Sequence, residues 1–174
     1  MRARPGRDVA MTGKQIVATV VGAIIGILAV RYVGLVVLIP ALSVAACWWI
    51  FTRLGLHPRL VLPLAVAGGH GLWFFIGTVM ALAAGGNAQT LIEVGLETVI
   101  VFAIVAWGCV SRSRPALGVL IAYEVVSIGF NVMAWSGAGE LRPILAVHIA
   151  LRVIAIAGAA LALSRWSEIA PRPS

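Results

Sequence analysis

The sequence has few charged residues, only two cysteines and none of the common catalytic motifs. Charged residues make up 11% of its 174 positions, against about 25% in soluble globular domains. Neither Cys47 nor Cys109 has a second cysteine or a histidine at ligand spacing, so the sequence does not support a zinc site or a thioredoxin-like motif. Both are expected to be small buried side chains. The Gly-x-Ser-x-Gly, His-Glu-x-x-His, Gly-x-Gly-x-x-Gly and Gly-Lys-Ser/Thr motifs are absent, so no catalytic residue is predicted and the sequence favours a non-enzyme.

Long apolar runs take the place of charge. Hydrophobic residues make up 61% of the chain and the mean hydropathy is +1.06, values typical of an integral membrane protein. The formal net charge is +7, but the basic residues flank the apolar runs, where they set topology and contact lipid headgroups. No basic cluster with interleaved aromatics lies on a soluble segment, which excludes nucleic-acid binding.

The apolar runs predict an all-α fold, a bundle of six transmembrane helices. The predicted spans are residues 15–30, 33–51, 60–84, 90–110, 116–135 and 144–164, most of them near the roughly 20 residues that cross a bilayer. The first run is interpreted as a retained helix rather than a removed signal peptide. The domain organisation is then an N-terminal tail (1–14), a transmembrane domain (15–164) and a C-terminal tail (165–174), with both tails expected to be disordered.

Basic residues predict the orientation. If the N-terminus is inside, ten basic residues lie on the cytoplasmic side and only Arg31 and Arg142 lie outside. This positive-inside pattern predicts that both termini are cytoplasmic, most simply in a bacterial inner membrane.

Ionisable side chains inside the spans mark a candidate site, because each costs several kcal/mol in hydrocarbon unless paired or hydrated. They are Glu93, Glu97, Glu124, His148 and Arg152. Counting about 1.5 Å per residue from the outer edge puts Glu97 and Arg152 at similar depth, which predicts an ion pair, with Glu93–His148 as a second. Glu124, near the midplane, has no obvious cationic partner. Whether these groups form a ligand or ion pathway, or only fix the helix register, stays open.

Three further residues belong to the candidate site. Asn131 is expected about 6 Å from the outer edge. His70 follows Gly68 and Gly69 and shares a helical face with Trp73, which suits either close helix packing or an aromatic wall for a ligand. The same depth count puts His70 about 15 Å deeper than His148, too far apart for the axial ligands of one haem. No cofactor and no metal site is predicted.

Two patterns concern assembly. The sequence of predicted helices 3–4 aligns with that of helices 5–6 at an offset of 55 residues, which places Glu97 opposite Arg152. This alignment suggests a parallel internal repeat. Ala18, Gly22 and Gly26 form a stripe of small residues on the first helix, suited to packing within the bundle, to a second copy or to a partner subunit.

The general plan resembles the substrate-binding membrane subunits of energy-coupling-factor vitamin transporters. The resemblance lies in the six helices, the length and the small-residue stripe at Ala18 and Gly22. It implies a partner on the first helix and an outward pocket lined by helices four to six. The chain lacks the long first outer loop of that family, so no binding residue is carried over.

The sequence therefore predicts a membrane protein with an outward-facing polar pocket that binds or transports a small solute or ion. Proton coupling through the glutamates, or a role as one subunit of a larger transporter, fits this prediction. The alternative is a scaffold or assembly subunit that does not transport and whose buried Glu–Arg and Glu–His pairs are structural.

Overall fold

The computed structural model describes residues 34–169, and all of the regular structure in that part of the chain is helical. The five α-helices within these residues are α2 (Leu35–Arg53), α3 (Pro58–Ala83), α4 (Ala88–Ser111), α5 (Arg114–Ala134) and α6 (Arg142–Ser164). Three 3₁₀ turns accompany them: η1 (Trp135–Gly137) and η2 (Gly139–Leu141) connect α5 to α6, and η3 (Trp166–Glu168) follows α6. The predicted first span, with its Ala18, Gly22 and Gly26 stripe, lies outside the described residues.

Among the described residues, four segments are long and apolar enough to cross a membrane. They are Pro58–Ala83, Leu91–Ser111, Arg114–Gly137 and Gly139–Ser164, and Val37–Arg53 is a shorter apolar helix. A chain whose described regular structure is all helical and includes these segments is an integral membrane protein. The all-α prediction is confirmed for the described residues, whereas the number of six spans stays a prediction.

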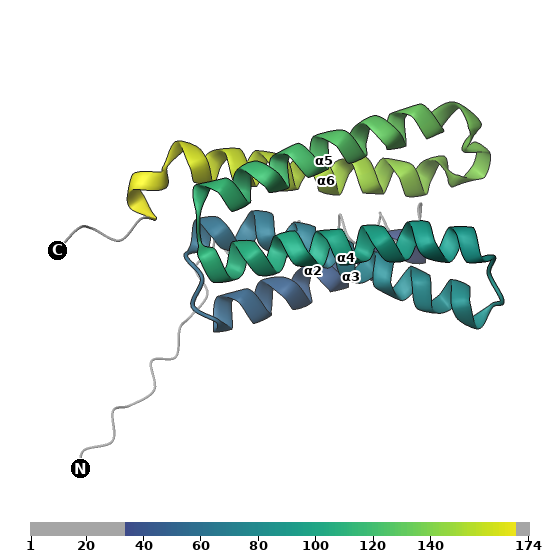
Figure 1. The fold of residues 1–174 in the computed structure, drawn as a ribbon, viewed down its shortest axis with the longest axis horizontal. Coiled ribbons are helices and arrows are strands. Elements are labelled where there is room, and N and C mark those ends of the chain that lie inside the picture. The colour runs from purple at the N-terminus through teal and green to yellow at the C-terminus, as the bar shows by residue number, and fades with distance from the viewer. Residues whose placement is uncertain (1–33, 170–174) are drawn as a thin grey trace, which may run out of the picture. The chain divides into compact units, whose positions relative to one another are not determined.

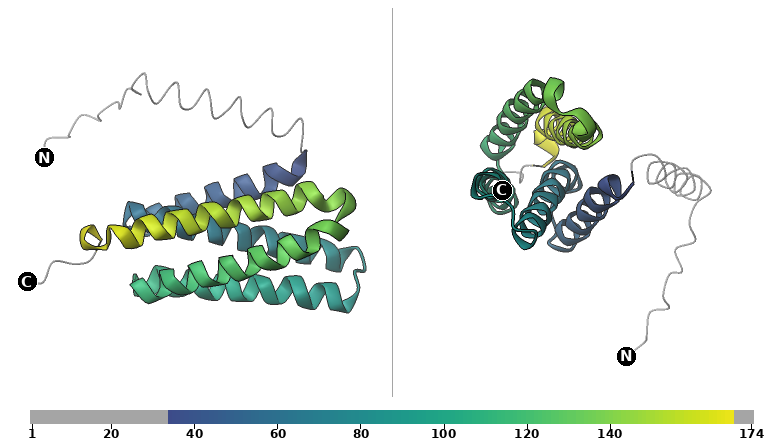
Figure 2. Two further views of the ribbon diagram at one scale, coloured as in Figure 1. Left: turned by 90° about the horizontal axis from the view of Figure 1, so that it is seen from above. Right: turned by 90° about the vertical axis from the view of Figure 1, so that its right-hand side faces the viewer.

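The chain divides into two compact units, Met1–Leu38 and Ile39–Ser174. The second unit by itself is an antiparallel helical bundle in which successive helices run in opposite directions (Figures 1 and 2). Within it α3 packs extensively on α4 and α6, and α5 packs on α6, whereas the contact between α4 and α5 is smaller. A strict two-fold repeat would make the α3–α6 and α4–α5 contacts equal, so the internal repeat stays a prediction from sequence.

Proline and glycine define where the helices begin and end. Helices α3, α5 and α6 each carry proline in the first turn, where the missing backbone N–H has no helical partner to lose. The backbone N–H of Arg59 donates to the ring of His57 at 3.3 Å, which caps α3. Gly55 and Gly85, just after α2 and α3, have φ near +70° (68° and 75°), a conformation that favours glycine.

Glycines also bring the helices close together. A Cβ added to Gly69 on α3 would lie 2.5 Å from the backbone of Val44 on α2. A Cβ on Gly158 of α6 would lie 3.2 Å from the Pro63 ring of α3. The prediction that the glycines beside His70 permit close helix approach is therefore confirmed. Pro63 lies inside α3, and Pro40 lies inside α2.

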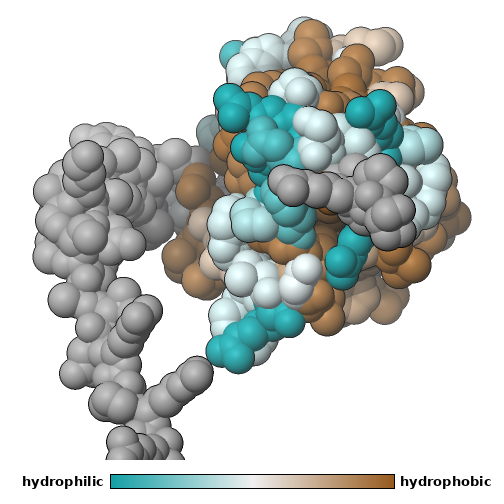
Figure 3. Space-filling view, turned by 90° about the vertical axis from the view of Figure 1, so that its left-hand side faces the viewer, coloured by the Kyte–Doolittle hydropathy of each residue, from teal (hydrophilic) through white to brown (hydrophobic). Residues whose placement is uncertain are grey.

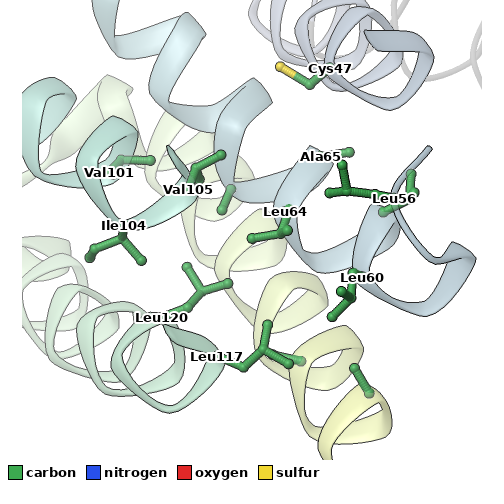
Figure 4. Packing of buried hydrophobic residues seen from close by; sticks show 14 residues of the cluster. Cys47, Leu56, Leu60, Leu64, Ala65, Val101, Ile104, Val105, Leu117 and Leu120 are labelled. Carbon is green, nitrogen blue, oxygen red and sulfur yellow. The ribbon is translucent and has the colours of Figure 1, made fainter. Parts of the chain in front are cut away.

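An apolar core fills the bundle, and apolar side chains also cover its sides. Figure 4 shows the core, where Leu60 and Leu64 of α3 lie in one cluster with Leu117 and Leu120 of α5. The two free cysteines belong to this packing as predicted, Cys47 buried and Cys109 partly buried. Many large apolar side chains point outward from the helices, as a bilayer requires; among them are Leu42, Phe75, Leu96, Val110, Met133 and Leu161.

The end of the bundle where α3 and α5 begin is strongly basic, and we call it the basic end. Its described basic residues are Arg53, Arg59, Arg112, Arg114 and Arg165. Figure 3 shows the hydrophilic residues at this end, framed by apolar sides. The prediction of a disordered C-terminal tail is wrong for its first residues. Trp166–Glu168 forms η3, and Glu168 is paired with Arg59 on α3.

Candidate intramembrane polar site

Four helices bring polar side chains together inside the bundle, and we call this group the polar cluster. Its members are His70 on α3, Glu97 on α4, Tyr123 and Glu124 on α5, and His148 and Arg152 on α6. All six lie within the segments long enough to span a membrane. The cluster is therefore embedded at membrane depth rather than at a loop.

Arg152 is the centre of the polar cluster. Its Nη1 donates to Glu124 Oε2 at 2.8 Å, and its Nη2 donates to Glu97 Oε1. The hydroxyl of Tyr123 donates to the same Glu97 oxygen at 3.1 Å. The guanidinium also lies over the rings of Phe74 and Tyr123, 5.8 and 5.6 Å from their centroids. One guanidinium thus serves two carboxylates and two aromatic faces.

Glu97, Arg152 and Glu124 form a triad, and their side chains are buried to different extents. The side chains of Arg152 and Glu124 are 1% and 0% exposed, whereas that of Glu97 is 30% exposed. Glu97 therefore connects a sealed ion pair with the outside of the bundle. It lies on α4, next to the less extensive contact between α4 and α5.

A histidine pair lies beside the triad. His70 Nε2 and His148 Nδ1 are 2.5 Å apart, so one ring donates a hydrogen bond and the other accepts it. The ring of Trp73 stacks on His148 at a centroid distance of 4.2 Å, and Phe74 stacks on His70 at 4.5 Å. His148 and Arg152 are one helical turn apart on α6, which joins the histidine pair to the triad.

Several buried polar atoms of the site have no hydrogen-bond partner among the described residues. They are Glu124 Oε1, Arg152 Nε, His70 Nδ1 and Asn131 Nδ2. An unsatisfied buried polar group costs about 1–3 kcal/mol, so such atoms ordinarily bind a protein group or an ordered water. The described residues contain no group of three or more His, Cys, Asp or Glu that would hold a metal ion.

The predictions of which polar side chains pair with each other have mixed outcomes. The Glu97–Arg152 ion pair is confirmed. The prediction that Glu124 lacks a cationic partner is wrong, because Arg152 has two donors on separate nitrogens and serves both acids. The predicted Glu93–His148 pair is also wrong: Glu93 is exposed and accepts a hydrogen bond from Gln89 at 2.9 Å, while His148 pairs with His70.

The depth assigned to His70 is wrong as well. Counting residues from the outer end of each span gives relative depths only if all spans end in one plane. Because His70 and His148 are in contact, α3 and α6 must be offset or tilted relative to each other. The depth difference therefore no longer excludes a shared haem.

Trp73 and Asn131 differ in their relation to the cluster. Trp73 contacts both histidines of the pair, with ring centroids 5.9 Å from His70 and 4.2 Å from His148. Asn131 is partly buried on α5, about two turns from Glu124, and no hydrogen bond joins it to the cluster among the described residues.

Sequence reasoning did not identify Tyr123 and Phe74. Tyr123 directly precedes Glu124, so the two side chains point about 100° apart, toward α4 and α6 respectively. Its mid-span position, far from the interfaces where tyrosine gathers, was the signal available. Phe74 lies one turn after His70, a spacing that puts both on one face.

The comparisons with known proteins do not identify a relative. No protein-family model, no curated protein and no solved structure matches this chain.

Proposed function

We propose that the protein binds or transports a small solute or ion through the polar cluster, with the Glu97–Arg152–Glu124 triad taking part in proton coupling. The observation that carries the proposal is the ratio of charges: two carboxylates bind one buried guanidinium. An uncompensated charge is costly away from water, so the triad has room for one proton or one further cation. A purely structural pair needs only one acid per base.

Glu97 supports the proposal as the point of entry. It is the partly exposed member of the triad, and Tyr123 and Arg152 bind the same carboxylate oxygen. A proton or solute that reaches Glu97 would therefore compete for Arg152 and change the charge that Glu124 experiences. The histidine pair, one turn away from Arg152, offers a second exchangeable proton.

The proposed setting is the one predicted from sequence, with six spans and both termini in the cytoplasm of a bacterial inner membrane. The basic end would then face the cytoplasm, and the end of the bundle at Arg142 would face outward. Glu97 and His148 would lie in the outer half of the bilayer. A second copy or a partner subunit on the first helix remains part of this proposal.

The second candidate function is a scaffold that does not transport. It is favoured by the complete burial of Arg152 and Glu124 against each other, as in a dry structural pair. Three hollows among the described residues also lie elsewhere, since their lining residues do not belong to the polar cluster.

Water access separates the two functions. In a background with Cys47→Ala and Cys109→Ala, single cysteines are placed by Glu97→Cys, Arg142→Cys and Leu120→Cys. A membrane-impermeant thiol reagent is then added to intact cells. The exposed Arg142 position should react fast, and the core position of Leu120, 0% exposed, should not react. We expect Glu97→Cys to react at a rate close to that of the exposed control.

Protection of Glu97→Cys from the reagent, with the controls behaving as stated, would contradict the proposed outward-facing pathway and favour the scaffold. If Glu97→Cys reacts, a panel of small charged solutes is screened for thermal stabilisation of the purified protein, since a ligand that binds only the folded state raises its stability. The same panel with Glu124→Gln tests whether binding depends on an ionisable group at the triad.

A further inference from the structure

A groove at the basic end is independent of the polar cluster. It lies between α2, α3 and α6 and has a volume of about 390 Å³. Its floor includes Gly158 and Ala162, two small residues of α6 whose size leaves the space open. Leu62 and Leu161, 37% and 63% exposed, form its apolar rim. In a membrane protein, such a groove faces acyl chains rather than water.

Polar groups lie only at the end of the groove where the helices end. Arg59 and Arg165 line it there, together with Trp48. Tryptophan and arginine are the side chains that gather at the headgroup level of a bilayer. The groove therefore runs from the hydrocarbon side of the bundle to the interface, as a phospholipid does.

Arg59 has a donor to spare at this position. Its Nη2 contacts Glu168 Oε2 at 2.5 Å, but its Nη1 is buried and has no hydrogen-bond partner among the described residues. Arg165 is held loosely, with its Nη1 3.9 Å from Glu168 Oε1 and the side chain 63% exposed. Two arginines against one glutamate leave a net positive charge, and Arg53, Arg112 and Arg114 add to it at the same end.

We propose that this groove binds one anionic phospholipid, with its phosphate on Arg59 and Arg165 and an acyl chain along Leu62 and Leu161. When the partly exposed Arg59 side chain turns toward the groove, its Nη1 would donate to a phosphate oxygen, because guanidinium and phosphate match in geometry and charge. Basic pockets between membrane helices bind such headgroups for the same reason. Glu168 limits the affinity, because its carboxylate occupies the other donor of Arg59.

Native mass spectrometry of the purified full chain in detergent tests the proposal. The protein is titrated with dioleoyl phosphatidylglycerol or dioleoyl phosphatidylcholine, which share acyl chains and differ in charge. We expect one phosphatidylglycerol to bind more tightly than phosphatidylcholine. Arg59→Gln should weaken phosphatidylglycerol about fivefold, whereas Arg142→Gln at the opposite end should leave it unchanged. Equal losses in both variants, or equal binding of both lipids, would overturn the proposal.

Glu168→Gln provides a test in which the expected result is tighter rather than weaker lipid binding. Removing the competing carboxylate should tighten phosphatidylglycerol severalfold, even though it breaks the contact with Arg59. Weaker binding by Glu168→Gln would mean that η3 merely holds the groove together and would overturn the proposal. Leu161→Asn should weaken binding. Leu96→Asn should not, because Leu96 is a similarly exposed leucine on α4, away from the groove.

Two further experiments distinguish the lipid from other occupants of the groove. Inorganic phosphate at millimolar concentration should not displace the lipid, because the apolar groove contributes to its binding. Complete displacement would assign the arginines to a free phosphate and overturn the lipid proposal. Tighter lipid binding by a chain that ends at residue 169 would assign the groove to the protein's own residues 170–174, with the same consequence.

Discussion

At the residue scale, the polar cluster depends on one side chain that satisfies two acids. Arg152 is almost fully buried, and its two terminal nitrogens point at carboxylates from different helices. The sequence predicted the Glu97–Arg152 pair because the two residues lie at similar depth on their spans. It did not predict the Glu124 contact, since depth along a helix says nothing about which neighbour a side chain faces.

Removal of Arg152 should destabilise the protein more than removal of either acid. Arg152→Gln leaves two buried carboxylates without a cation, which is expected to cost about 3–5 kcal/mol of unfolding free energy. Glu124→Gln should cost less, because Arg152 keeps Glu97. Thermal unfolding of the purified proteins, followed by intrinsic fluorescence, measures the differences.

The double variant distinguishes a coupled pair from two independent losses. The double variant Arg152→Gln with Glu124→Gln should recover part of the stability that Arg152→Gln alone loses. The reason is that the carboxylate left unpaired at residue 124 is then absent as well. Glu93→Gln is the control, since Glu93 is exposed, and its effect should stay within about 0.5 kcal/mol. Strictly additive losses in the double variant would show that the contact contributes no coupling energy.

At the element scale, the described helices begin and end close to where the apolar runs predicted. α3 spans Pro58–Ala83 where the sequence predicted 60–84, because Pro58 and the glycine after the helix are local signals. What the sequence did not provide is the offset between α3 and α6. That offset depends on how Gly158 fits against Pro63, and it brings His70 level with His148.

The packing of α2 on α3 predicts different effects at two adjacent glycines. Gly69→Ala would put a methyl group 2.5 Å from the Val44 backbone, which a side-chain rotation cannot relieve. We expect a loss of about 1–3 kcal/mol, measured as a lower melting temperature in detergent.

Gly68→Ala is the matched control for this prediction. Its new Cβ would lie 3.4 Å from Cys47 Sγ and 3.5 Å from the Phe51 ring, close to ordinary contact distances. Its melting temperature should therefore stay near that of the unchanged protein. Equal melting temperatures for the two variants would mean that α2 does not pack on α3 at Gly69.

At the scale of the whole bundle, the turn after α6 is tied to the start of α3. Glu168 lies on η3 and contacts Arg59 in the first turn of α3. The hydrogen bond from Arg59 lowers the pKa of Glu168 below its ordinary value. A group with a lowered pKa in the folded state stabilises the structure above its unfolded pKa, and the contribution is lost as the pH falls through the folded value.

This linkage predicts that η3 detaches from α3 in acid. Hydrogen exchange of residues 165–169 should be slow at neutral pH and should accelerate below about pH 4, the ordinary range of a glutamate, after correction for intrinsic rates. Glu168→Gln should exchange fast at every pH, because its amide carries no charge to lose. A wild-type profile without this acid transition would contradict the assignment of the contact.

The sequence by itself determined the class of protein, the described helices and their bounds, the basic end and the Glu97–Arg152 pair. Hydrophobicity, helix-start prolines and charge counts are local properties, so they can be evaluated without a fold. Only the tertiary structure decided the second acid on Arg152, the contact between His70 and His148, and the turn that Glu168 ties to Arg59. Each of these depends on the offset and rotation of one helix against another, which close packing between side chains sets and which no single segment encodes.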